Sequence, residues 1–177
     1  MAIHAFVDES ARRDRYILCA ATVDTSRLDE VRRLLRGLCL PGQRRWHFKH
    51  ESTPRQRQIL DVIARCGAVQ ALIYEGSGKE LPVRRECLAA LVFDLVDRQA
   101  GRLVIESRET MDHFDRSCIA QTLRKASEHL GYAHLRPHEE PGLWLPDALA
   151  WAYGAGGDWR RRVQPIIEHT RNVGQVS

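Results

Sequence analysis

An apolar segment near the start of the sequence places the strongest constraint on the fold. Residues 2–10 read Ala-Ile-His-Ala-Phe-Val-Asp-Glu-Ser. Side chains alternate between the two faces of a strand, so Ile3, Ala5 and Val7 would share one face and Phe6 would lie on the other. A strand that is apolar on both faces is typical of the centre of a sheet covered on both sides. The segment therefore predicts a sheet with helices on both faces.

Two acids, Asp8 and Glu9, close this apolar run. Folds that alternate helices with parallel strands place their sites at the carboxyl ends of strands, which makes Asp8 a candidate site residue. Strands also commonly end in polar residues where the chain leaves the core, and this alternative explains both acids without a function. Position alone does not decide between the two interpretations.

Strands and helices alternate along the rest of the sequence. Apolar runs predict strands over residues 16–23, 45–51, 68–74 and 102–106, with a short one at 133–135. Apolar residues at helical spacing predict helices over residues 28–38, 53–66, 82–96, 112–130, 145–153 and 159–167. Two strands followed by this alternation indicate an α/β fold with a sheet of about five strands flanked by helices. No repeat or linker divides the chain, so residues 1–177 are expected to form a single domain.

Arginine supplies most of the positive charge. The chain has 27 Lys and Arg against 23 Asp and Glu, a net charge of +4. Arginines form short clusters at residues 12–13, 32–33, 44–45, 84–85 and 160–162. A guanidinium group can bind phosphate through two hydrogen bonds at once, so these clusters are candidate contacts for nucleic acid. The excess is modest, and an ordinary solvated surface explains it as well.

The cysteines and the N-terminus bear on the compartment. Five widely spaced cysteines form no CxxC pair: Cys19, Cys39, Cys66, Cys87 and Cys118. Their odd number, with no secretory signal at the N-terminus, predicts reduced and mostly buried thiols in a cytoplasmic protein. No apolar run approaches the ~20 residues that cross a bilayer, so no membrane partner is expected.

Four acids lie at the ends of predicted elements: Asp8, Glu51, Glu106 and Asp147. Carboxylates that are brought together repel and raise one another's pKa, and a divalent cation removes that penalty. Mg²⁺ needs only a few carboxylate oxygens and keeps several waters, so phosphate oxygens can complete its coordination. Each acid could also serve only its own element, as Asp147 would at a helix N-terminus. The joint pattern predicts a cation site if the acids converge.

Four short motifs resemble, in order, those of the domain of unknown function 3800 family. Phe-Val-Asp-Glu-Ser at residues 6–10 resembles the family's opening strand, which typically ends Asp-Glu-Ser-Gly. Trp-His-Phe-Lys at 46–49 is similar to its third strand, and Val-Ile-Glu-Ser at 104–107 to its strand that ends in an acid. Leu-Pro-Asp-Ala-Leu-Ala at 145–150 is similar to its late helix, which carries the last acid. The resemblance covers nearly the whole chain.

This family is grouped with the RNase H-like proteins. The resemblance therefore implies an RNase H-like mixed sheet and a metal-dependent nuclease whose acids are Asp8, Glu106 and Asp147. The chain departs from the family's pattern at three positions. Ala11 stands where the family has Gly, which requires a different turn, and Pro146 precedes the last acid in place of Ala. Glu106 stands where Asp is common, so its carboxylate reaches one methylene further.

Two groups of histidines and acids offer a different metal site: His47, His50 and Glu51, and His138, Glu139 and Glu140. Their side chains suit zinc or manganese. Neither group has the spacing of HExxH, HxxEH or a zinc finger, and on a strand His47 and His50 would point to opposite faces. A single histidine that moves protons beside a carboxylate site is the better-supported role, with His47 and His138 as candidates.

Other catalytic templates are absent from the sequence. It contains no GxxxxGK[ST], no GxGxxG after a strand and no GxSxG. Four tryptophans could stack on the bases of a single strand: Trp46, Trp144, Trp151 and Trp159. Tryptophan is more often a core or interface residue, and a core position is favoured for Trp151.

Together, these features favour a divalent-metal-dependent nuclease or related phosphodiesterase that acts on RNA or DNA. The candidate ligands of Mg²⁺ or Mn²⁺ are Asp8, Glu106 and Asp147. Further candidate catalytic residues are Glu51 as a fourth acid, and His47 or Lys49 to orient or protonate. The candidate phosphate contacts are Arg12, Arg13, Arg44, Arg45 and Lys49. The alternative is an RNase H-like module that has lost full metal coordination and binds nucleic acid or protein without cutting it.

Overall fold

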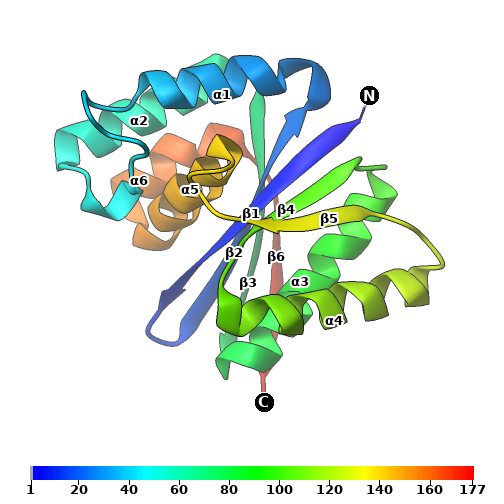
Figure 1. Ribbon diagram of the computed structural model, residues 1–177. Helices are drawn as coiled ribbons and strands as arrows, with labels where there is room; N and C mark the ends of the chain where they lie inside the picture. Colours follow the sequence, from blue (N-terminus) through cyan, green and yellow to red (C-terminus); the bar gives the residue numbers. More distant parts are fainter. Residues whose placement is uncertain (1) are drawn as a thin grey trace.

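Six strands form one mixed sheet (Figure 1). The computed structural model describes residues 2–177. The strands are β1 (Ile3–Arg12), β2 (Arg15–Asp24), β3 (Val69–Gly78), β4 (Arg102–Glu106), β5 (Gly131–Leu135) and β6 (Ile167–Val176). Their order is β5-β4-β1-β2-β3-β6, in which β2 is antiparallel to β1 and β3 and all other neighbours are parallel. The expected α/β fold with a mixed sheet is confirmed, but the strand predicted over residues 45–51 is not in the sheet and β6, which the sequence does not predict, is.

Helices cover both faces of the sheet. They are α1 (Leu28–Gly37), α2 (Thr53–Cys66), α3 (Glu80–Asp97), α4 (Glu109–Ala126), α5 (Trp144–Ala155) and α6 (Gly157–Val163). α1, α2, α5 and α6 lie on one face and α3 and α4 on the other (Figure 1). Each layer encloses its own cluster of buried apolar side chains against the sheet.

β1 lies between β4 and β2 and is buried on both faces. Phe6 packs in the core under α1, α2 and α5, and Val7 packs in the core under α3 and α4, as the two-sided apolar pattern predicts. The expectation that the strand ends at Asp8 is wrong, because β1 continues to Arg12 in a hairpin with β2. Its pairing with β4, however, stops at Val7 opposite Ile105. Asp8 therefore follows directly after the last residue that pairs with β4.

Residues 45–51 form a loop and not the strand that their alternation predicts. The segment contains only a short 3-10 helix, Phe48–His50, and is not part of the sheet. Trp46 and Phe48 are fully buried in the core of the α1 and α5 layer, and the Trp46 indole N–H donates to the Leu35 carbonyl oxygen at 3.2 Å. The alternation thus reflects two aromatic side chains that attach a loop to the core.

β6 is an edge strand that hydrophobic patterning does not predict. The helix expected over residues 159–167 ends at Val163, and after a 3-10 turn the chain enters β6 at Ile167. None of its residues is fully buried, and its register with β3 shifts at two places. β6 is held by hydrogen bonds to β3 more than by burial, so its sequence lacks the period-2 apolar signal.

A close contact with Phe6 sets the start of α5 against the sheet. Gly142 lies in the 3-10 turn Pro141–Leu143 directly before α5. A Cβ atom on Gly142 would lie 2.5–2.6 Å from atoms of the Phe6 ring, so only glycine permits this approach. The same turn is tied to α1, because the Glu140 carboxylate accepts from Gly142 N at 2.9 Å and pairs with Arg32 at 2.7 Å. α5 consequently begins directly over β1.

The five cysteines are free thiols, and Cys19, Cys87 and Cys118 are buried. This agrees with the expectation of unpaired and mostly buried cysteines. Of the helices in residues 2–177, none combines the length and the apolar character needed to cross a bilayer.

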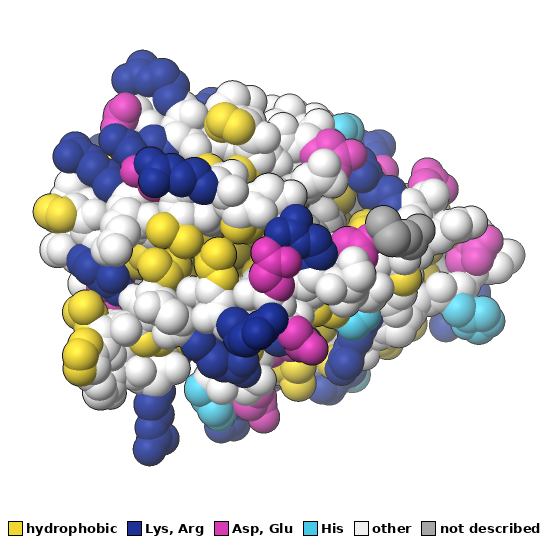
Figure 2. Space-filling view, turned by 90° about the horizontal axis from the view of Figure 1, so that it is seen from above, with side chains coloured by type: hydrophobic (Ala, Val, Ile, Leu, Met, Phe, Trp, Pro, Cys, Tyr) yellow, Lys and Arg dark blue, Asp and Glu magenta, His cyan; other side chains and the backbone are white. Residues whose placement is uncertain are grey.

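Charged side chains are mixed over the surface. Seen from above, Lys and Arg side chains lie in several separate groups, with Asp and Glu among them (Figure 2). For the residues that the structure describes, this face carries no continuous basic stripe. On this face, cations are therefore available to a polyanion only as local groups.

Candidate active site

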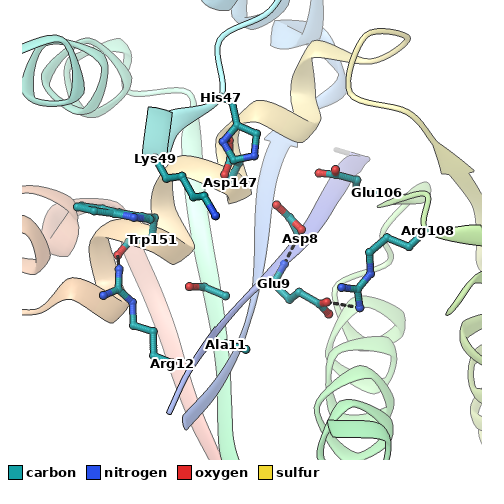
Figure 3. A pocket seen from close by; sticks show the side chains of 11 residues that line it. Asp8, Glu9, Ala11, Arg12, His47, Lys49, Glu106, Arg108, Asp147 and Trp151 are labelled. Carbon is teal, nitrogen blue, oxygen red and sulfur yellow. Dashed lines mark hydrogen bonds and ion pairs between the residues drawn. The ribbon is translucent and has the colours of Figure 1, made fainter. Parts of the chain in front are cut away.

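A cavity of about 500 Å³ opens beside β1, at the point where β1 and β4 separate (Figure 3). Its wall combines four acids with three basic side chains, Arg12, Lys49 and Arg108, from four segments of the chain. The lining residues are Asp8, Glu9, Ser10, Ala11, Arg12, His47, Lys49, Glu106, Arg108, Asp147 and Trp151. The cavity thus brings together Asp8, Glu106 and Asp147, the three acids that the sequence predicts as metal ligands.

The strand register explains why two of these acids meet. β1 and β4 are parallel, and their last paired residues are Val7 and Ile105. Asp8 and Glu106 each follow directly, so they occupy neighbouring positions on adjacent strands. Asp147 arrives from above the sheet, because it lies in the first turn of α5 and α5 packs over β1 and β2. Acids far apart in sequence are therefore adjacent by topology.

The carboxyl groups of Asp8, Glu106 and Asp147 affect one another electrostatically. Burial raises the pKa of Asp8 well above its ordinary value, and the negative charges of Glu106 and Asp147 raise it further. Burial also raises the pKa of Glu106, where Arg45 opposes the shift and Asp147 adds to it. Without a cation, the negative charge of each of these acids therefore opposes ionisation of its neighbours.

Asp147 is held in place by the loop before α2. Its Oδ2 accepts a hydrogen bond from Phe48 N at 3.0 Å, which leaves Oδ1 free of hydrogen bonds within residues 2–177. The His47 ring lies beside it, with Nδ1 3.9 Å from Asp147 Oδ2 (Figure 3). Burial lowers the pKa of His47, against the opposing effect of the Asp147 charge. The imidazole is therefore neutral near pH 7 and able to accept a proton.

Arg12 is fixed on the side of the cavity formed by α5. Its guanidinium lies 5.2 Å from the centre of the Trp151 ring, and Nη2 donates to the Trp151 carbonyl oxygen at 3.2 Å. Gly154 leaves room for this arrangement, since a Cβ atom there would lie 2.8 Å from Arg12 Nε. Lys49 reaches into the cavity from the loop above (Figure 3). A fixed cation of this kind suits a phosphate group.

Comparisons with known proteins bear on the fold. No family model matches the chain, and neither does any curated protein. The structure is similar to a chain of the PCNA:RNase HII complex from Archaeoglobus fulgidus, with a TM-score of 0.55 and 10% sequence identity. The match covers 92% of this chain and 75% of that chain. The fold is RNase H-like.

Several predicted site residues lie outside the cavity of this RNase H-like fold. Glu51 is nearly buried and accepts hydrogen bonds from Gln43 Nε2 at 2.8 Å and Arg55 Nε at 3.4 Å, so the structure does not bring it to the other acids. Arg13 is exposed in the β1–β2 hairpin and lines a separate hollow. Arg44 is exposed and Arg45 is half-buried, and neither lines the cavity.

Two residues that line the cavity differ from what the sequence predicts: Arg108 is not predicted at all, and Trp151 is predicted in the core. Arg108 is not part of any recognised motif, although it lies only two residues after Glu106, the last residue of β4. Trp151 was expected in the core, whereas it is partly exposed and lines the cavity. Trp46 and Trp144 are buried, and their rings pack edge to face at 5.5 Å. These two side chains therefore cannot stack on the bases of a nucleic acid.

Carboxylates are suitable ligands for a divalent cation, although the acids of the cavity are not grouped as a complete set of ligands. Within residues 2–177, no three His, Cys, Asp or Glu side chains are grouped so that they could hold a metal ion. In the second histidine group, the Glu140 carboxylate is engaged by Arg32 at 2.7 Å. The closely spaced pair Asp8 and Glu106 fits a cation that takes one or two carboxylates and keeps several waters, as Mg²⁺ does.

Proposed function

We propose that the protein is a divalent-metal-dependent nuclease or related phosphodiesterase that acts on nucleic acid. The observation that carries the proposal is the convergence of Asp8, Glu106 and Asp147 on one cavity that also contains Arg12 and Lys49. Acids at this density are unfavourable unless a cation is present, and cations around them suit a phosphodiester. The RNase H-like fold is compatible with this function but does not by itself establish it.

In this proposal Asp8 and Glu106 hold Mg²⁺ or Mn²⁺, with Asp147 as the third acid. A divalent ion bound there would act as a Lewis acid on the phosphodiester and its attacking water. Phe48 N fixes one oxygen of Asp147, so that carboxylate enters the cavity in a defined orientation. Because a ligating carboxylate must be ionised, the raised pKa of Asp8 would make binding of the cation more favourable as pH rises.

His47 and Lys49 would move the protons of the reaction. Hydrolysis forms a bond from the water oxygen to phosphorus and breaks the bond from phosphorus to the leaving oxygen. The neutral His47 imidazole would accept the proton of the water, and the Lys49 ammonium would supply one to the leaving oxygen. Arg12 would hold a backbone phosphate from the α5 side.

A second candidate is a module that binds nucleic acid or protein without cutting it. The observation that favours it is the absence, within residues 2–177, of three ligands already grouped for a metal. A fold of this type can lose catalysis and keep its binding surface. In that case the cations of the cavity would still contact phosphate, and the acids would carry no reaction.

Cleavage assays separate the two candidates. The wild-type protein should cut RNA or DNA in Mg²⁺ or Mn²⁺ and stop in EDTA, and Asp8→Asn should lower the rate by more than about 100-fold. Asp14→Asn is the matched control, because Asp14 is exposed in the β1–β2 hairpin and lies outside the cavity. If the wild type binds nucleic acid without cutting it and Asp8→Asn binds equally well, the binding module is the correct function.

We further propose that the chain belongs with the domain of unknown function 3800 family, on the four motifs quoted above. The first, third and fourth of these supply the acids of the cavity, and the second supplies His47 and Lys49. A cytoplasmic location likewise stays a prediction from the cysteine pattern and the N-terminus. Localisation of a tagged protein in cells would test it.

A further inference from the structure

A buried ionic network lies under the cavity, on the α3 and α4 side of the sheet. Arg84 is 4% exposed, and its guanidinium forms a fork on Asp115, with Nε–Oδ1 at 2.7 Å and Nη2–Oδ2 at 2.8 Å. Its Nη1 donates to the Tyr16 hydroxyl oxygen at 2.9 Å and pairs with Glu9. Buried charges of this kind persist only when each has a partner.

Glu9 has to share its buried cation with a second acid. The Arg84 guanidinium pairs with both Asp115 and Glu9, whereas Asp115 has a further partner in His134, whose Nε2 lies 3.3 Å from Asp115 Oδ2. Glu9 Oε2 accepts from Tyr16 Oη at 2.6 Å and pairs with Arg84, while Oε1 pairs with Arg108. The Glu9 side chain is only 12% exposed, so leaving it unpaired would be costly. Glu9 therefore draws Arg108 to the edge of the cavity.

Arg108 is the part of this network that faces solvent. Its side chain is 43% exposed and lines the cavity with Asp8 and Glu106 (Figure 3). Only Nη2 is engaged, with Glu9 and, at 3.3 Å, with Glu80. Within residues 2–177, Nε and Nη1 of Arg108 make no hydrogen bond. These donors are available to an oxyanion.

We propose that Arg108 binds a backbone phosphate of a nucleic acid that lies across Asp8, and that Glu9 is the positioning residue that holds Arg108 there. The inference rests on the proposed function and adds a contact opposite Arg12. In Figure 3, Arg12 and Arg108 reach the cavity from opposite sides of Asp8. A polynucleotide laid across Asp8 would present successive phosphates to the two arginines. Glu9 itself is not a metal ligand, because both of its oxygens are engaged.

Binding without cleavage tests the contact of Arg108. The probe is a fluorescein-labelled DNA strand on the order of ten nucleotides, used alone and paired with RNA or DNA, in EDTA. Single neutral methylphosphonates replace the phosphates one at a time, and anisotropy gives the affinity. In the wild type, the methylphosphonate that replaces the phosphate bound by Arg108 should lower the affinity, and we call this loss of affinity the penalty of that methylphosphonate. Arg108→Ala should weaken binding of the unmodified strand roughly tenfold and abolish this penalty. Arg116→Ala removes an exposed arginine of α4 outside the cavity and should do neither.

Two conservative variants separate positioning from charge and from folding. Glu9→Gln keeps the shape of the side chain and raises the net charge, so simple electrostatics would strengthen binding. A positioning role instead predicts that the penalty of that one methylphosphonate shrinks by at least about threefold, even if total affinity rises. Arg108→Lys should keep most of the total affinity. It should lose most of the penalty of that methylphosphonate, because a lysine cannot bind a phosphate through two parallel hydrogen bonds as a planar guanidinium does.

The outcomes distinguish this inference from the proposed function. If Arg108→Ala and Arg116→Ala behave alike, or if Glu9→Gln leaves the phosphate-specific penalty unchanged, the inference is wrong and the nuclease proposal is unaffected. If the Arg108 pattern appears but the protein never cuts in Mg²⁺ or Mn²⁺, the inference holds and the nuclease proposal is wrong. A wild type that binds none of the probes would overturn both.

Discussion

Asp8 and Glu9 are adjacent in sequence, yet they serve opposite faces of β1. Asp8 faces the α5 layer, where it meets Glu106 and Asp147. Glu9 faces the α3 layer, where it meets two arginines. The alternation of side chains along a strand is the whole reason for this division. One acid is left without a cation and the other has two, so their chemistry differs although their residue types are alike.

The raised pKa of Asp8 makes the metal-free protein less stable as pH rises. Folded Asp8 keeps its proton at pH values where the unfolded chain has lost it, so the folded state binds more protons and stability falls through that range. Asp8→Asn removes this effect. We expect it to be more stable than wild type near pH 8 in EDTA by on the order of 1 kcal/mol. The gain should vanish near pH 4, as measured by denaturant unfolding.

A cation should reverse the order of the two proteins. Adding Mg²⁺ or Mn²⁺ near pH 8 is expected to raise the melting temperature of the wild type and to leave Asp8→Asn nearly unchanged, because the ion binds only the folded carboxylates. Asp14→Asn is again the control, and it should follow the wild type in both buffers. An Asp8→Asn protein that is less stable than wild type at every pH would contradict this account.

The loop of residues 43–51 is the element that completes the cavity. Buried Trp46 and Phe48 attach it to the core, and Phe48 N in turn orients Asp147. His47 and Lys49 alternate with these anchors and therefore point toward the cavity. Glu51 belongs to the same element but is turned toward Arg55. The segment that resembles a strand in sequence is thus a loop that two buried aromatic side chains attach to the core.

Glu51 is expected to matter for stability and not for cleavage. Glu51→Gln should keep the cleavage rate within about twofold of wild type, because its carboxylate lies outside the cavity. It should lower the free energy of unfolding by roughly 1 kcal/mol, through loss of the charge-assisted hydrogen bonds with Gln43 and Arg55. Cleavage kinetics and urea unfolding check the two parts. A loss of rate comparable to that of Asp8→Asn would return Glu51 to the set of catalytic acids.

At the scale of the whole molecule, the separation of β1 from β4 creates the site. The parallel pairing of the two strands ends where their acids begin, and α5 closes the space from the other side. On the face shown in Figure 2, the basic residues lie in separate groups. Affinity for a polyanion should then come from the few cations that line the cavity: Arg12, Lys49 and Arg108.

The salt dependence of binding should report this small number of contacts. Three phosphate contacts predict that the logarithm of the association constant falls with the logarithm of salt concentration with a slope of roughly −2 to −3. Anisotropy titrations between low and moderate salt would measure the slope. A slope steeper than about −5 would mean that distant clusters such as residues 44–45 and 160–162 also bind the backbone.

The sequence by itself determined the two-sided burial of β1, the alternation of helices and strands, and the position of each acid at the edge of an apolar run. These follow from local periodicity, which a single segment contains in full. Only the tertiary structure decided that residues 45–51 form a loop, that β6 completes the sheet, that Glu51 lies outside the cavity and that Arg108 lines it. Each of these depends on a partner far along the chain: β3 for the edge strand, Arg55 and Gln43 for Glu51, and a buried arginine network for Arg108. Periodicity reports whether a residue is buried, whereas the identity of its neighbour is fixed only when the strands and helices are assembled.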